Sequence, residues 1–124
     1  LGLAVRLPAA DRARLRPARL LWMSHKRKRL DWETATSPGF YLHPQADYAR
    51  LMAEVGAQPT TGAMLIELIA RSAMAGLTLY GFDFFASLSL SGSRTAAQVP
   101  HDFAGEAAWV GALMARDPRI SRVI

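Results

Sequence analysis

The sequence predicts an α/β protein with a mostly parallel sheet flanked by helices. Short apolar segments alternate along the chain with longer segments of helical periodicity, and this order is typical of strands joined by helices. Hydrophobic residues make up 51% of the 124 residues, so the chain can bury a core. The length suits one domain or part of one. We therefore expect residues 1–124 to form a single domain or part of one.

The first third of the chain predicts two strands and a long loop. Segments 1–7 (LGLAVRL) and 18–23 (ARLLWM) have the length and composition of strands. Residues 11–17 form a charged connection that could hold one helical turn, and residues 24–38 predict an irregular loop. This loop carries four consecutive basic residues, which are Lys26, Arg27, Lys28 and Arg29. A solvated loop is the simpler interpretation of this basic run, and contact with an anionic substrate or a membrane surface is the alternative.

Two segments show the periodicity of helices that bury one face. The first is Gln45–Val55, which follows Pro44 and is stopped by Gly56. The second begins after His101 and ends before Pro118, and residues 120–124 then predict a closing strand. The core side chains expected from these helices are Tyr48, Leu51, Met52 and Val55, followed by Phe103, Ala107, Val110, Leu113 and Met114.

Residues 59–83 are the centre of the predicted fold. They begin with a helix that is apolar almost all round, and a helix of this kind is buried. Gly76 stands where a helix end commonly needs a left-handed residue, and residues 77–80 predict a strand. Thr60, Thr61 and Gly62 begin the helix, so they could bind an anion at its positive end. Capping of a core helix is the simpler interpretation of the same residues.

The sequence lacks the motifs of several kinds of site. It has no cysteine, and its histidines, His25, His43 and His101, do not form a metal-binding helical pair. The Gly-x-Ser-x-Gly, phosphate-loop, dinucleotide and Asp-x-Asp patterns are also absent. No apolar segment reaches the ~20 residues of a membrane helix. We therefore expect neither a metal site nor a membrane span.

His101, just before the last helix, is a candidate general base. An imidazole suits proton transfer near neutral pH. Glu106 lies about one helical turn inward, where it could orient the histidine or support the loop. In the alternative interpretation, Asp102 caps the helix and His101 is a surface loop residue.

Three short blocks occur in a fixed order along the second half of the chain. They are Pro59-Thr60-Thr61-Gly62, then Tyr80-Gly81-Phe82, then His101 with Glu106. Together they resemble the sialyltransferase family of glycosyltransferases that contains the animal enzymes. The first two blocks are similar to the two ends of that family's small sialyl motif, and the third is similar to its very small motif. The resemblance covers about half of the chain.

The resemblance implies a Rossmann-like glycosyltransferase half-domain and a role for each matching residue. His101 would be the catalytic base that takes the proton from the acceptor hydroxyl, and Glu106 would support the site. The donor, CMP-sialic acid or CMP-Kdo, would be bound by Thr60, Thr61, Gly62, Gly81 and Phe82. Members of the family invert the anomeric carbon without a metal or another cofactor, so none is expected here.

Departures from the family pattern narrow these expectations. The large sialyl motif and the short third motif are not found, and Met74 stands where animal members have a disulfide cysteine. We therefore expect the C-terminal portion of a catalytic domain from a bacterial-type enzyme that acts on a glycan acceptor. Its expected location is the cytoplasm, with peripheral contact to the inner face of the membrane. The contact residues would be Lys26, Arg27, Lys28 and Arg29.

Two other classes of function stay open. A non-catalytic remnant or binding domain would keep the scaffold without the chemistry, and the missing third motif favours it. A nucleic-acid-binding module would explain the net charge of +5, but aromatic residues do not interleave with the basic run. We therefore rank a nucleic-acid partner last and expect none.

Overall fold

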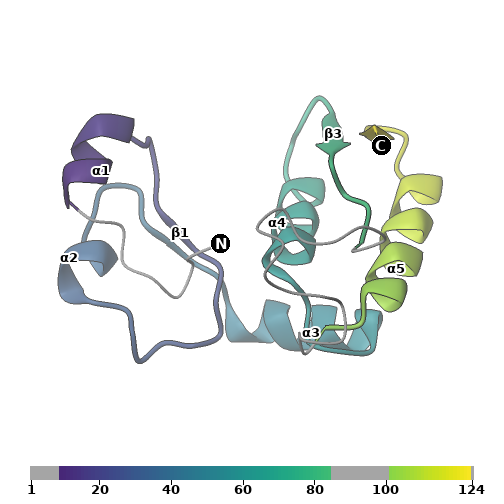
Figure 1. Ribbon diagram of the computed structural model, residues 1–124, viewed down its shortest axis with the longest axis horizontal. Coiled ribbons are helices and arrows are strands. Elements are labelled where there is room, and N and C mark those ends of the chain that lie inside the picture. Colours follow the sequence, from purple (N-terminus) through teal and green to yellow (C-terminus); the bar gives the residue numbers. More distant parts are fainter. Residues whose placement is uncertain (1–8, 85–100, 124) are drawn as a thin grey trace. The chain divides into compact units, whose positions relative to one another are not determined.

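The computed structural model describes residues 9–84 and 101–123, which belong to two compact units (Figure 1). The units are Leu1–Tyr48 and Ala49–Ile124, and each is described by itself. The strand expected at 1–7 lies outside the described residues. The single-domain prediction stays a prediction.

The first unit contains two short helices and two short strands. They are α1 (Ala9–Leu15), β1 (Leu21–Trp22), α2 (Trp32–Ala35) and β2 (Tyr41–Leu42), with β1 parallel to β2. The charged connection is therefore a two-turn helix, and the strand predicted at 18–23 keeps only two residues. The irregular loop contains α2, whose first turn is capped by Asp31, and β2 was not predicted. Elements of two to four residues are too short to show a hydrophobic period.

The second unit confirms the predicted order of elements. Helix α3 (Gln45–Val55) begins just before it and is followed by α4 (Thr61–Ala70), β3 (Leu77–Tyr80), α5 (Phe103–Arg116) and β4 (Ile120–Val123). Strands β3 and β4 pair in parallel over four residues. The α/β class and the parallel pairing are thus confirmed, as two separate two-stranded sheets among the described residues. The finer Rossmann-like prediction stays a prediction.

The core of the second unit comes from one face of each helix and from the strand pair. Its buried apolar side chains are Leu51, Val55, Ala63, Met64, Ile66, Leu79, Trp109, Val110, Leu113 and Ile120. Helix α4 has no exposed residue, as its all-round apolar composition predicts. Met52 is the exception to the predicted stripe: it is 38% exposed, because it lies beside the buried Leu51 at the edge of that face.

Helix α4 ends earlier than predicted, and Gly76 does not cap it. Its last helical residue is Ala70, and the C-cap residue Arg71 keeps a right-handed conformation. Gly76 is not among the glycines with positive φ. The carbonyl of Ala70 instead accepts a hydrogen bond from Arg119 Nη2 at 3.0 Å. A cation at a helix C-terminus satisfies a free carbonyl and complements the helix dipole, so the chain needs no left-handed glycine there.

Helix α3 lies across the N-terminal ends of α4 and α5 (Figure 1). The carbonyl of Val55, its last residue, is so close to Gly105 that an added Cβ would be 2.9 Å away. One turn further along α5, Trp109 Nε1 donates a 2.9 Å hydrogen bond to Glu54. These contacts fix the start of α5 against the end of α3.

The carboxyl of Asp117 should stay ionised to lower pH than an ordinary aspartate. Arg119 donates to both of its oxygens, at 2.9 and 2.7 Å, and these hydrogen bonds lower the pKa of Asp117. Its stabilising contribution is therefore present above the pKa of the unfolded chain and is lost as the pH falls through the folded pKa. An NMR titration should place the midpoint below the usual value of about 3.9. Arg119→Ala should raise that midpoint, and an unchanged value would contradict the assignment.

None of the helices in the described ranges has the length and apolar character that crossing a membrane requires.

Candidate functional site

A cavity of about 200 Å³ brings together residues from all three sequence blocks. It is lined by Thr60, Gly81, Phe82, Asp83, Phe84, Phe103 and Glu106. Four of the predicted site residues therefore meet in one place, although they are up to 46 positions apart in the sequence. Of the other three, His101, Thr61 and Gly62 are not among the described residues that line the cavity.

Thr60 and Glu106 join the start of α4 to the start of α5. The hydroxyl oxygen of Thr60 accepts the Ala63 N–H at 3.1 Å, which is the N-cap bond of α4. The Glu106 carboxylate, only 2% exposed, accepts the Thr60 N–H at 2.6 Å and the Thr60 hydroxyl at 2.7 Å. The chain's own carboxylate thus occupies the positive end of α4, where the sequence allowed an external anion.

The first and second sequence blocks contact each other through Gly62 and Phe82. A Cβ added to Gly62 would lie 2.9 Å from the edge of the Phe82 ring, so the ring rests on the glycine. Gly81 adopts a φ of +72°, in the left-handed region that favours glycine. Apart from its chain neighbours, no described residue has an atom within 4 Å of a Cβ added there, so Gly81 serves the turn of the backbone.

His101 is held by the loop before α4. Its Nδ1 lies 2.7 Å from the carbonyl oxygen of Gln58, two residues before Thr60. A carbonyl oxygen only accepts, so Nδ1 carries the proton, and Nε2 of the neutral ring keeps its lone pair. The ring also makes an edge contact with Phe103, with the centroids 6.0 Å apart. With the proton on Nδ1 and the lone pair on Nε2, the ring has the tautomer that a general base acting at Nε2 requires. As the alternative interpretation expected, Asp102 caps α5 by accepting the Gly105 N–H at 2.9 Å.

Three phenylalanines form the apolar wall of the cavity. The ring centroids of Phe82 and Phe84 lie 6.4 Å apart, and the two rings are tilted relative to each other. Phe103 comes from the first turn of α5. Phe84 has a positive φ of 54°, and the Arg122 guanidinium lies 5.6 Å from its ring centroid. The sequence analysis left Asp83, Phe84 and Phe103 out of the site. The run of aromatic residues directly after β3 was the signal that could have indicated a lined cavity.

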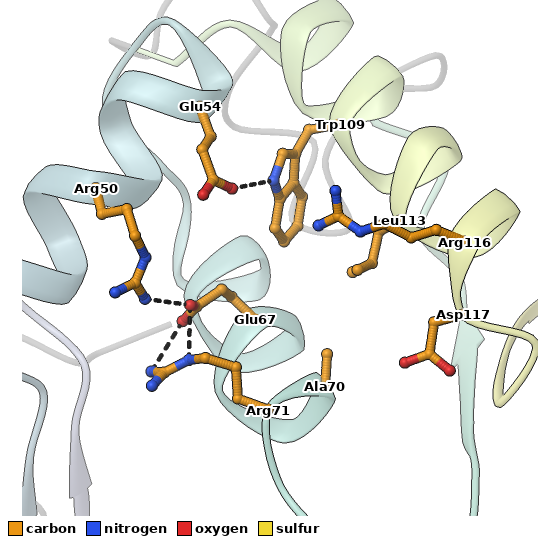
Figure 2. Close-up of a pocket in the computed structure, with 9 residues that line it drawn as sticks. All are labelled: Arg50, Glu54, Glu67, Ala70, Arg71, Trp109, Leu113, Arg116 and Asp117. Atoms are coloured by element: carbon orange, nitrogen blue, oxygen red, sulfur yellow. Dashed lines mark hydrogen bonds and ion pairs between the residues drawn. The ribbon is translucent and has the colours of Figure 1, made fainter.

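A larger cavity of about 440 Å³ lies among α3, α4 and α5 (Figure 2). Arg50 and Arg71 converge there on the buried carboxylate of Glu67, at 2.5 and 2.7 Å. On the opposite wall Trp109 donates to Glu54, and Arg116 and Asp117 complete the charged lining (Figure 2). The three basic and three acidic side chains balance, and Glu54 and Glu67 are both held by other residues of the chain. The cluster therefore stabilises the packing of α3 against α4 and α5.

Glu67 was not among the predicted site residues. A single charged residue in a helix that is apolar all round is a signal of a buried ion pair, because a buried carboxylate needs partners. The partners themselves lie 17 residues upstream and four residues downstream. Only the folded chain identifies them.

The remaining candidate residues lie in the first unit. His25 stacks on Tyr48 with the ring centroids 4.8 Å apart, and burial raises the pKa of the Tyr48 hydroxyl. His43 is buried, and its carbonyl accepts a hydrogen bond from Arg27. No group of three or more His, Asp or Glu side chains suited to a metal ion occurs in the described parts of the chain.

No protein-family model matches this chain, and comparison with curated proteins and with solved structures gives no match either.

Proposed function

We propose that this chain is part of an inverting, metal-independent glycosyltransferase that moves sialic acid, or a related acidic sugar, from a CMP donor to a glycan hydroxyl. The observation that supports this proposal is the cavity lined by Thr60, Gly81, Phe82 and Glu106. These residues come from three separate blocks that resemble the sialyltransferase motifs, and a shared site requires that the blocks meet.

The described cavity would hold only part of the donor. Its volume of about 200 Å³ is below the ~300–1,000 Å³ of typical ligand pockets. Its phenylalanine wall suits the flat face of a nucleobase, and the left-handed turn at Gly81 lets backbone approach a ligand closely. The rest of the donor would extend out of this cavity.

The contacts around α4 change the roles proposed for the first block. The amide and the hydroxyl of Thr60 both bond to Glu106, so this threonine acts by holding the site together. Glu106 is then a positioning residue. Direct contact with the donor would then fall to Gly81 and Phe82, which line the cavity, whereas Thr61 and Gly62 begin α4 outside its described lining.

His101 would supply the chemistry. Its Nε2 would take the proton of the acceptor hydroxyl as that oxygen attacks the anomeric carbon, while CMP leaves from the opposite face with the bonding electrons. The Gln58 carbonyl fixes the ring, so the lone pair needs no reorganisation before the reaction. A positioned general base contributes typically ~10²–10⁴-fold to the rate.

Replacing His101 tests the proposal in the full-length protein. His101→Asn keeps a side-chain donor for the Gln58 carbonyl but removes the base, and it should lower transfer from CMP-sialic acid or CMP-Kdo by at least about a hundredfold. CMP binding, measured by calorimetry, should stay within about threefold of the parent protein. Transfer can be followed by release of CMP. A His101→Asn protein that transfers at a near-normal rate would remove His101 from the mechanism.

A non-catalytic scaffold is the second candidate, and one observation favours it. Thr60 stands where the resemblance implies a donor-binding hydroxyl. Its amide and hydroxyl instead donate to Glu106, and its hydroxyl oxygen accepts the Ala63 N–H. A full-length protein that binds CMP but shows no transfer to any of a panel of glycan acceptors would favour this candidate. Transfer at a rate that depends on His101 would exclude it.

A further inference from the structure

The net positive charge of this chain comes entirely from its first unit. Residues 1–48 contain nine basic and four acidic side chains, whereas residues 49–124 contain six of each. The net charge of +5 is therefore carried by the first unit, and the second unit, which holds the cavities, is neutral. Such an asymmetry indicates a partner of negative charge for the first unit.

Three of the four residues in the basic run are presented to solvent. Lys26, Lys28 and Arg29 are exposed, whereas Arg27 is half-buried and donates to the carbonyl of His43 at 2.5 Å. The Arg27 carbonyl also accepts the Leu30 N–H at 3.1 Å, which closes a turn. Arg27 is thus the residue that anchors the run, and its three neighbours are left as a cationic turn (Lys26, Lys28 and Arg29).

An exposed tryptophan follows the cationic turn directly. Trp32 is the first residue of α2 and is 82% exposed, although indole rings are normally well buried. Asp31 caps α2 by accepting the Thr34 N–H at 2.7 Å, so the backbone that carries Trp32 is fixed. The Arg12–Glu33 ion pair, 3.6 Å long, adds a link from α1 to the next residue of α2.

We propose that the first unit docks on an anionic lipid bilayer, with Trp32 at the level of the headgroups and the cationic turn against the lipid phosphates. Basic residues next to a tryptophan are the combination that anchors proteins at a membrane interface, because the indole ring suits the boundary between polar and apolar layers. Nucleic acid fits less well. Of the two exposed rings that flank the basic run in the described residues, His25 is already stacked on Tyr48, and Trp32 alone offers no series of stacking platforms. This inference does not depend on the proposed transferase activity.

Binding to vesicles tests the proposal directly. The protein should co-sediment with vesicles of phosphatidylglycerol and phosphatidylcholine (3:7) and should bind at least tenfold more weakly to pure phosphatidylcholine. The triple variant K26S/K28S/R29S should lose roughly a hundredfold in affinity, since each basic residue near an anionic surface contributes about fivefold. Arg116→Ser, an exposed charge of the second unit, should change the affinity by less than twofold.

Tryptophan fluorescence reports whether Trp32 enters the bilayer. The other two tryptophans, Trp22 and Trp109, are only 5% and 9% exposed, so a change of environment on binding should come from Trp32. Anionic vesicles should shift the emission maximum to the blue, and the Trp32→Phe variant should lose that shift while staying folded by circular dichroism.

Several outcomes would overturn the proposal. They are equal affinity for neutral and anionic vesicles, unchanged binding of the triple variant, or no blue shift in the parent protein. Inorganic phosphate at 10 mM that competes the protein off the vesicles would indicate a soluble anion site in place of a lipid surface. Tighter binding to double-stranded DNA than to anionic vesicles at 150 mM salt would assign the first unit to nucleic acid instead.

Discussion

Replacing Glu106 with alanine should lower the free energy of unfolding by about 3 kcal/mol. The carboxylate is 2% exposed and accepts both the amide and the hydroxyl of Thr60. Its loss would leave two donors at the start of α4 without acceptors in a buried place, together with a cavity the size of the missing side chain. Urea unfolding followed by circular dichroism measures this loss.

Two further variants show whether the contact itself is responsible. Glu106→Gln keeps one acceptor oxygen and the volume of the side chain. It should therefore lower the free energy of unfolding by less than half as much as Glu106→Ala does. Glu33→Ala removes a glutamate whose side chain is 55% exposed, and it should change stability by less than about 0.5 kcal/mol. A Glu106→Ala protein as stable as the Glu33→Ala protein would show that the Thr60–Glu106 contact carries no stability.

Replacing Gly105 with alanine should destabilise the protein by about 2 kcal/mol, although alanine is the better helix former. The added Cβ would lie 2.9 Å from the backbone oxygen of Val55 and 2.7 Å from Oδ2 of Asp102, the second oxygen of the capping carboxylate. Backbone cannot move aside cheaply, so α5 would have to shift away from α3 or lose its N-cap. Thermal unfolding of the variant measures the cost.

The matched control lies in the same helix. Gly111 is exposed, and a Cβ added there meets no atom of residues 9–84 and 101–123 within 4 Å, its own helix backbone aside. Gly111→Ala should therefore stabilise the protein by about 0.5–1 kcal/mol, as helix propensity alone predicts. If both substitutions stabilise, the close approach of α3 and α5 at Gly105 is not present in solution.

The candidate site was predictable only in part. The sequence pattern picked out Thr60, Gly81, Phe82 and Glu106, and the folded chain brings them to one cavity. It did not indicate that Glu106 would satisfy Thr60, because that contact spans 46 residues and leaves no local period. Of the phenylalanine wall, Phe82 was predicted and Phe84 could have been, because both follow β3 directly, whereas Phe103 belongs to a different element and no local pattern links it to them.

The sequence by itself determined the elements that are long enough to repeat a hydrophobic period. Helices α3 and α5 stand where their apolar residues place them, because the helical period of each segment allows one buried face. Only the tertiary structure decided how these elements end and what their charges do. At the end of α4, Arg119 donates to a free carbonyl where a left-handed Gly76 was predicted. At its start, Glu106 accepts the Thr60 N–H where an external anion had been allowed. Both are long side chains that reach an end of α4 from a distant part of the chain, so no residue within α4 predicts them.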